Sequence, residues 1–161
     1  MSNADHTPVR AIMQEKIVTI SAHESLSTVE DIMRLGRVRH MPVVNGGKLV
    51  GVVSERDLLR NSLSSLSSHR QDERKAFLYA VEIGRVMSQP AVVIDPDASI
   101  KQAARTMADA KIGCLPVVLD DALIGLVTET DVLRWVAHDR SEDPARPGSS
   151  ASARTRTATP A

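Results

Sequence analysis

The sequence predicts an α+β fold made of two similar halves that follow each other along the chain. One heptapeptide pattern occurs twice, as GVVSERD at 51–57 and as GLVTETD at 125–131. The second copy follows the first by 74 positions (125 − 51), and the same offset relates Met13 to Met87 and Pro42 to Pro116. An ungapped offset across several elements indicates an internal duplication.

The first half alternates between strand-like and helix-like spacing. Residues 9–14 are expected to form a short helical turn, and the β-branched run 17–20 a strand. From Ser25 the apolar residues recur at helical intervals, which predicts an amphipathic helix that ends at Gly36. Strands at 41–44 and 49–53 flank the turn Asn45-Gly46-Gly47, and the next helix is expected to begin at Ser54.

The second half is expected to repeat this order after a connecting segment. Serine-rich residues 61–69 break the pattern, and residues 72–83 suggest a connecting helix. The replayed elements are a strand at 91–94, a helix at 99–110, strands at 115–119 and 123–127, and a helix from Thr128. The predicted organisation is a flexible N-terminus (1–8), a first repeat (9–66), a linker with a helix (67–84), a second repeat (85–138) and a disordered tail (139–161).

Composition argues against several classes of protein. Twenty basic residues balance twenty acidic ones, so a general attraction to nucleic acid or to anionic membranes is not expected. The apolar runs are far shorter than the roughly 20 residues that cross a bilayer, so we expect no membrane insertion and a cytoplasmic protein. Cys114 is the sole cysteine, the histidines lack metal-ligand spacing, and no nucleophile–base pair is visible. We therefore expect no metal site, no catalytic residue and no enzyme.

Each heptapeptide lies where an apolar strand passes into a helix. Such a junction presents free backbone N–H groups and the positive end of a helix dipole, which suits an anionic or hydroxyl-rich ligand. Ser54 with Asp57, and Thr128 with Asp131, also fit capping boxes that stabilise the helix start. The junctions therefore have two interpretations, capping and ligand binding, which can coexist.

The order of elements, the strands with Pro42 and Pro116, and the twin Gly-x-x-(Ser/Thr)-x-x-Asp junctions resemble a tandem pair of CBS domains, the modules named after cystathionine β-synthase. The likeness covers about residues 9–138. It implies two β-α-β-β-α repeats packed sheet to sheet about a pseudo-twofold axis, in a stand-alone module of the bacterial Bateman type. It also implies two clefts between the repeats, which commonly take AMP, ADP, ATP or S-adenosylmethionine.

The resemblance assigns roles to positions of this chain. Asp57 and Asp131 match the ribose position, and Ser54 and Thr128 match the hydroxyl position near the sugar or first phosphate. Asp131 is expected to face the Arg39 segment, and Asp57 the Cys114 segment. Further wall and phosphate contacts are expected from Thr19, Val38, Arg39, His40, Met41, Arg56, Val93, Ile112, Gly113, Cys114 and Leu115.

The two repeats differ at these positions. Arg39, His40 and Arg56, with Arg37, form a basic group that suits phosphates or is a solvated surface cluster, and the second repeat has Gly113, Cys114 and Thr130 instead. The two clefts should therefore not be equivalent. Cys114 beside an adenine pocket has two interpretations, a redox-sensitive thiol and a small buried apolar residue.

The leading functional hypothesis is a regulatory module that senses adenine nucleotides and acts as a homodimer on an unknown protein in trans. The adenine nucleotide is a regulatory ligand, and no cofactor is expected. The alternative is a dimerisation and interaction scaffold whose clefts are vestigial and bind nothing.

Overall fold

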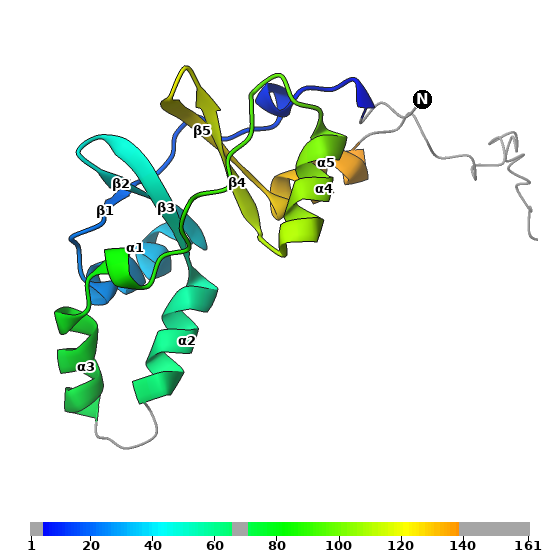
Figure 1. Cartoon of the computed structure of the whole chain (residues 1–161). Helices are drawn as coiled ribbons and strands as arrows, with labels where there is room; N and C mark the ends of the chain where they lie inside the picture. Colours follow the sequence, from blue (N-terminus) through cyan, green and yellow to red (C-terminus); the bar gives the residue numbers. More distant parts are fainter. Residues whose placement is uncertain (1–4, 66–70, 139–161) are drawn as a thin grey trace, which may run out of the picture.

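The computed structural model describes residues 5–65 and 71–138 and has two halves that meet through their sheets (Figure 1). The described residues contain five α-helices and two sheets. This confirms the α+β class, and β3 of one half contacts β5 of the other. The predicted tail at 139–161 lies outside the described residues.

The first half contains a three-stranded sheet and three helices. Strand β1 is parallel to β2, and β2 is antiparallel to β3. The elements are β1 (Ile20–Ser21), α1 (Leu26–Gly36), β2 (His40–Asn45), β3 (Lys48–Ser54), α2 (Glu55–Ser65) and α3 (Gln71–Ala80). Helix α1 begins where Ser25 Oγ accepts from the backbone N–H of Thr28 at 3.3 Å, and its buried face lies on the sheet.

The second half repeats the plan with a two-stranded sheet. Strands β4 and β5 are antiparallel, with the same register shift in the middle as β2 and β3. The elements are α4 (Ile100–Ala110), β4 (Cys114–Leu119), β5 (Ala122–Thr128) and α5 (Glu129–His138). Ser99 caps α4 as Ser25 caps α1. Within the described residues, no helix is both long and apolar enough to cross a bilayer.

The two halves exchange their lead-in segments. Residues 9–14, with the 3₁₀ helix η2 (Val9–Ala11), lie beside β5, where Gln14 and Leu126 exchange backbone hydrogen bonds of 2.8 and 2.9 Å (Figure 1). The 3₁₀ helix η3 (Ile83–Arg85) packs on the first half, and Ser88 pairs with Val52 of β3. Each hydrophobic core is therefore completed by a segment that precedes the other repeat, as fully buried Val9 and Ile83 show.

This exchange explains why two predicted strands are much shorter than expected. The run 17–20 gives only the two-residue β1, and the run 91–94 gives only a bridge from Ile94 to Val117. Residues 15–19 must cross from β5 to β2, and residues 89–93 must cross from β3 to β4. The predicted strands were too long because a crossing segment cannot stay paired with one neighbour.

The predicted break at 61–69 was also wrong over its first part. Helix α2 continues to Ser65, and Asn61 Nδ2 donates to the Asp57 carbonyl at 2.8 Å within it. Leu58 and Ser62 are buried, and α2 contacts both α1 and α3. Tertiary packing thus outweighs the low helix propensity of serine and asparagine. Residues 66–70 lie outside the described part.

The start of the chain also makes contacts. The Thr7 carbonyl accepts from the backbone N–H of Ile100 at 3.0 Å, and Lys101 Nζ lies 2.7 Å from Asp5 Oδ1. Residues 5–8, expected to belong to a flexible N-terminus, therefore dock on α4. Residues 1–4 lie outside the described chain.

Candidate ligand-binding cleft

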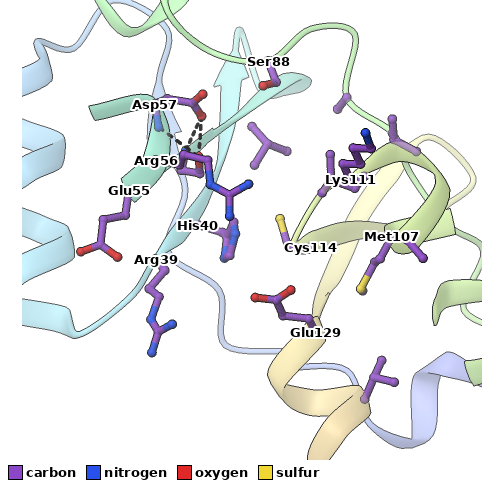
Figure 2. Close-up of a pocket in the computed structure, with 18 of the residues that line it drawn as sticks. Arg39, His40, Glu55, Arg56, Asp57, Ser88, Met107, Lys111, Cys114 and Glu129 are labelled. Carbon is purple, nitrogen blue, oxygen red and sulfur yellow. Dashed lines mark hydrogen bonds between the residues drawn. The ribbon is translucent and has the colours of Figure 1, made fainter. Parts of the chain in front are cut away.

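A cleft of about 700 Å³ lies between the two halves and takes its walls from both. The first half supplies the end of β3 and the start of α2, and the second supplies α4, the start of β4 and the start of α5 (Figure 2). The lining residues are Arg39, His40, Val52, Ser54, Glu55, Arg56, Asp57, Arg60, Ser88, Pro90, Ala91, Val92, Ala104, Met107, Ala108, Lys111, Ile112, Gly113, Cys114, Glu129, Val132 and Leu133.

Asp57 has one carboxylate oxygen engaged and one open. Its Oδ2 accepts from the backbone N–H of Ser54 at 2.8 Å and from the Ser54 hydroxyl at 2.7 Å. Ser54 Oγ in turn accepts from the backbone N–H of Asp57 at 3.2 Å, which completes a capping box. Among the described residues no side chain or backbone group donates to Oδ1. Capping therefore leaves Asp57 with an acceptor for a ligand.

Asp131 occupies the equivalent junction but has no open oxygen. Its Oδ2 accepts from the backbone N–H and the hydroxyl of Thr128 at 2.9 and 2.7 Å. In addition, Gln14 Nε2 lies 3.2 Å from Oδ1 and 3.1 Å from Oδ2 and donates to the carboxylate. Asp131 is only 7% exposed, whereas Asp57 is half-buried.

Four basic side chains line the cleft at Asp57, together with the acidic Glu55 and Glu129. Arg39, Arg56, Arg60 and Lys111 all line it, and Arg56 lies beside His40 facing the second half (Figure 2). Three of these four come from the first half, although Lys111 of the second half lies across the opening. An arginine-rich rim can hold phosphate oxygens, since guanidinium groups bond them in pairs.

His40 fits against Gly113, and its burial disfavours the protonated ring. Burial is the main cause that lowers the pKa of His40 below its ordinary value of 6.5, and Arg39 adds to this, while Glu129 opposes it. A Cβ on Gly113 would lie 2.7 Å from His40 Nε2, so the ring occupies the space that a side chain at 113 would need. Burial therefore works against a positive charge on His40 within the expected basic group.

Cys114 is a buried free cysteine whose thiol stays protonated. Burial, with the Asp57 and Glu129 carboxylates adding to it, raises the pKa of Cys114 to about 12. Because the thiolate is the reactive form, this environment favours the apolar role over the redox role.

The cleft gathers about half of the residues expected from the sequence. Asp57 shares it with the Cys114 segment, and the predicted residues that line it are Ser54, Asp57, Arg39, His40, Arg56, Ile112, Gly113 and Cys114. The remaining predicted residues, which do not line it, are Asp131, Thr128, Thr19, Val38, Met41, Val93 and Leu115.

Several of those outside the cleft have other surroundings. Met41 and Leu115 are fully buried, one in each core, and Val38 packs against the first core. Thr19 and Val93 are exposed on the crossing segments. Their side chains are therefore not walls of this cleft.

Sequence reasoning missed Met107 and Ser88 as lining residues. Met107 on α4 lines the cleft, and Ser88 lines it from the exchanged segment. The heptapeptides gave no signal for them, because the exchange of segments is a tertiary feature. The 74-residue offset would have shown that Gln14 and Ser88 are equivalent positions.

Comparison with known proteins identifies the same repeats. The family model for the CBS domain matches residues 9–64 and 83–138. An uncharacterized protein of Methanocaldococcus jannaschii is 30% identical over 135 residues, which cover 81% of this chain and 32% of that protein. The chain spans only 32%, 43% and 45% of the length of three such curated relatives.

Solved structures share the fold over most of the chain. A Vibrio cholerae protein assigned to acetoin utilization, AcuB, has a TM-score of 0.70 and 31% identity, covering 82% of this chain and 92% of that one. CBSX2, solved in complex with AMP, has a TM-score of 0.69 and 26% identity, covering 83% of this chain and 99% of that one.

Proposed function

The chain belongs to the CBS domain family, and we propose that it is a regulatory module that binds an adenosine-containing nucleotide in the cleft at Asp57. The proposal rests on one observation. Oδ1 of Asp57 accepts no hydrogen bond from the described residues and lies in a cleft that both halves line. CBSX2, a relative of the same fold, was solved with AMP.

Each part of the cleft has a role in this proposal. Asp57 Oδ1 accepts hydrogen bonds from ribose hydroxyls, while Oδ2 stays with Ser54. Arg56 and Lys111 hold phosphate from opposite sides of the opening. The apolar side chains of Val92, Met107, Ile112 and Cys114 supply the wall on which adenine packs.

The regulatory step follows from where the walls come from. A nucleotide that touches both halves binds best to one arrangement of the halves, so it shifts the population toward that arrangement. We infer that this shift acts on a partner protein in trans. Homodimerisation belongs to the same proposal, supported by Leu59 of α2 and Leu133 of α5, which are 56% and 66% exposed at equivalent positions.

Isothermal titration with AMP, ATP and S-adenosylmethionine tests the proposal. The informative variant is Asp57→Asn, which can still accept from Ser54 but presents no second carboxylate oxygen. At least one of these ligands should bind the wild type, and Asp57→Asn should weaken that binding roughly 10- to 100-fold, as expected when a charge-assisted hydrogen bond is lost.

Asp131→Asn is the matched control, because Asp131 has the same local motif but does not line the cleft. It should leave the affinity at Asp57 almost unchanged. No heat for any of the three ligands would refute the proposed function. Equal loss in both variants would show that the nucleotide is not held by Asp57.

A further inference from the structure

We infer that Gln14 closes the second cleft of this chain by acting as an internal substitute for a ligand, so that the chain takes one nucleotide, at Asp57. This inference rests on the proposed function, because it concerns which of two related carboxylates receives the ligand. It concerns a residue that none of the sequence motifs includes.

The contact at Asp131 resembles the one expected from a ligand. An amide N–H₂ group and a ribose hydroxyl are both neutral donors, and Gln14 Nε2 donates toward both carboxylate oxygens at 3.2 and 3.1 Å. With Thr128 also bonded to Oδ2, the carboxylate has no oxygen without a partner. A ligand hydroxyl would therefore compete with Gln14 for this carboxylate.

Ser88 provides the internal comparison. It lies 74 positions after Gln14 (88 − 14), and its backbone pairs with Val52 as that of Gln14 pairs with Leu126. The side chain of Ser88 therefore starts beside Asp57 from the same kind of backbone position as the side chain of Gln14 beside Asp131. Ser88 lines the open cleft, but its short side chain donates no described hydrogen bond to Asp57. The length of the side chain at this position decides whether the carboxylate of the junction is bonded from the exchanged segment.

The backbone at Gln14 is held firmly enough to keep this arrangement. Gln14 N donates to the Leu126 carbonyl at 2.8 Å, and Leu126 N donates back at 2.9 Å. A Cβ on Gly125 would lie 2.7 Å from Met13 Sδ and 3.1 Å from Gln14 O, so the segment lies tightly on β5. The side chain of Gln14 is therefore directed by paired backbone rather than by a loose loop.

Reciprocal exchange of the two residues tests the inference. Titration of the intact chain with AMP, ATP and S-adenosylmethionine in turn should give one site per chain in the wild type for each ligand that binds. Gln14→Ser should give two sites, because it frees Asp131 for ligand. Ser88→Gln should abolish or weaken binding at Asp57 at least tenfold, because the new amide reaches the free oxygen.

Glu15→Ser is the matched control, since Glu15 is exposed as Gln14 is, but among the described residues it makes no hydrogen bond to Asp131. It should keep one site per chain. Two sites in the wild type, or one site in both the wild type and Gln14→Ser, would overturn the inference while leaving the proposed function intact. No binding in the wild type with one site in Gln14→Ser would instead refute the proposed function and support the closure. No binding in any variant would overturn both.

Discussion

The junctions at Asp57 and Asp131 have the same local motif but opposite surroundings. In both, a Ser or Thr and the Asp three residues later form a capping box with nearly equal distances. Asp57 then opens into a cleft, whereas Asp131 is buried under the amide of Gln14. The difference comes from the segment that the opposite repeat contributes, so a motif alone does not define a site.

A second pair of regions differs in a complementary way. His40 of the first repeat lies against Gly113 of the second, and their positions correspond to Cys114 and Arg39. Because the two segments meet between the halves, a bulky residue on one side requires a small one on the other. The small residues Gly113 and Cys114 of the second repeat therefore allow the two repeats to pack together. The same differences make the two clefts unequal.

The largest expected effect concerns the glycines under the exchanged segments. A Cβ on Gly51 would lie 2.7 Å from Ser88 O, whereas at Gly125 the corresponding backbone oxygen is 3.1 Å away. Backbone must move in the first case, so Gly51→Ala should lower the free energy of unfolding by about 1–3 kcal/mol, more than Gly125→Ala. Urea denaturation of both variants measures this difference.

This clash should outweigh the gain of about 0.4–1 kcal/mol that alanine gives by restricting the unfolded chain. Gly51→Ala should also weaken AMP binding, since it displaces Ser88 at the cleft. A larger loss of stability in Gly125→Ala would contradict the idea that the closer approach of Ser88 O to a Cβ at position 51 sets the cost.

A smaller effect is expected where His40 meets Gly113. Gly113→Ala places a Cβ 2.7 Å from His40 Nε2 and should cost about 1 kcal/mol of stability. In a His40→Ala background the same change should cost much less, because the space is then free. The double-mutant cycle, measured by urea denaturation, should give a coupling of about 0.5–1 kcal/mol. Additive effects would show that the two segments do not compete for space.

The smallest expected effect is on the pH dependence of stability, to which His40 contributes near neutral pH and its counterpart Cys114 does not. Burial lowers the pKa of His40 in the folded chain below its ordinary value of 6.5. Between the lowered pKa of the folded chain and 6.5, the unfolded chain binds more protons than the folded one. Stability should therefore fall as pH drops below 6.5, and this loss is complete below the folded pKa. Cys114, with a pKa of about 12, contributes nothing in that window.

The variant His40→Gln removes this titration and should make stability less dependent on pH in that window. Thermal unfolding of wild type and variant at a series of pH values measures the change. His138→Gln is the control, since His138 is exposed at the end of α5. An unchanged pH dependence in His40→Gln would show that folding does not alter the protonation of His40.

Much of this protein was predictable from the sequence, because local patterns determine local structure. The helical spacing from Ser25 and Ser99, with a serine at each cap, predicted α1 and α4. The turn at Gly46-Gly47 and the β-branched runs around it predicted the β2–β3 hairpin. The two heptapeptides at a constant offset predicted the duplication and both strand-to-helix junctions.

Only the tertiary structure decided how the two copies use each other. Exchange of the segments around Val9 and Ile83 shortened two predicted strands and brought Gln14 to Asp131. Gln14 and Asp131 are 117 positions apart in the chain. The geometry of their contact depends on how the two sheets pack rather than on nearby sequence. The sequence therefore determined that there are two junctions, and packing decided that one is open and the other closed.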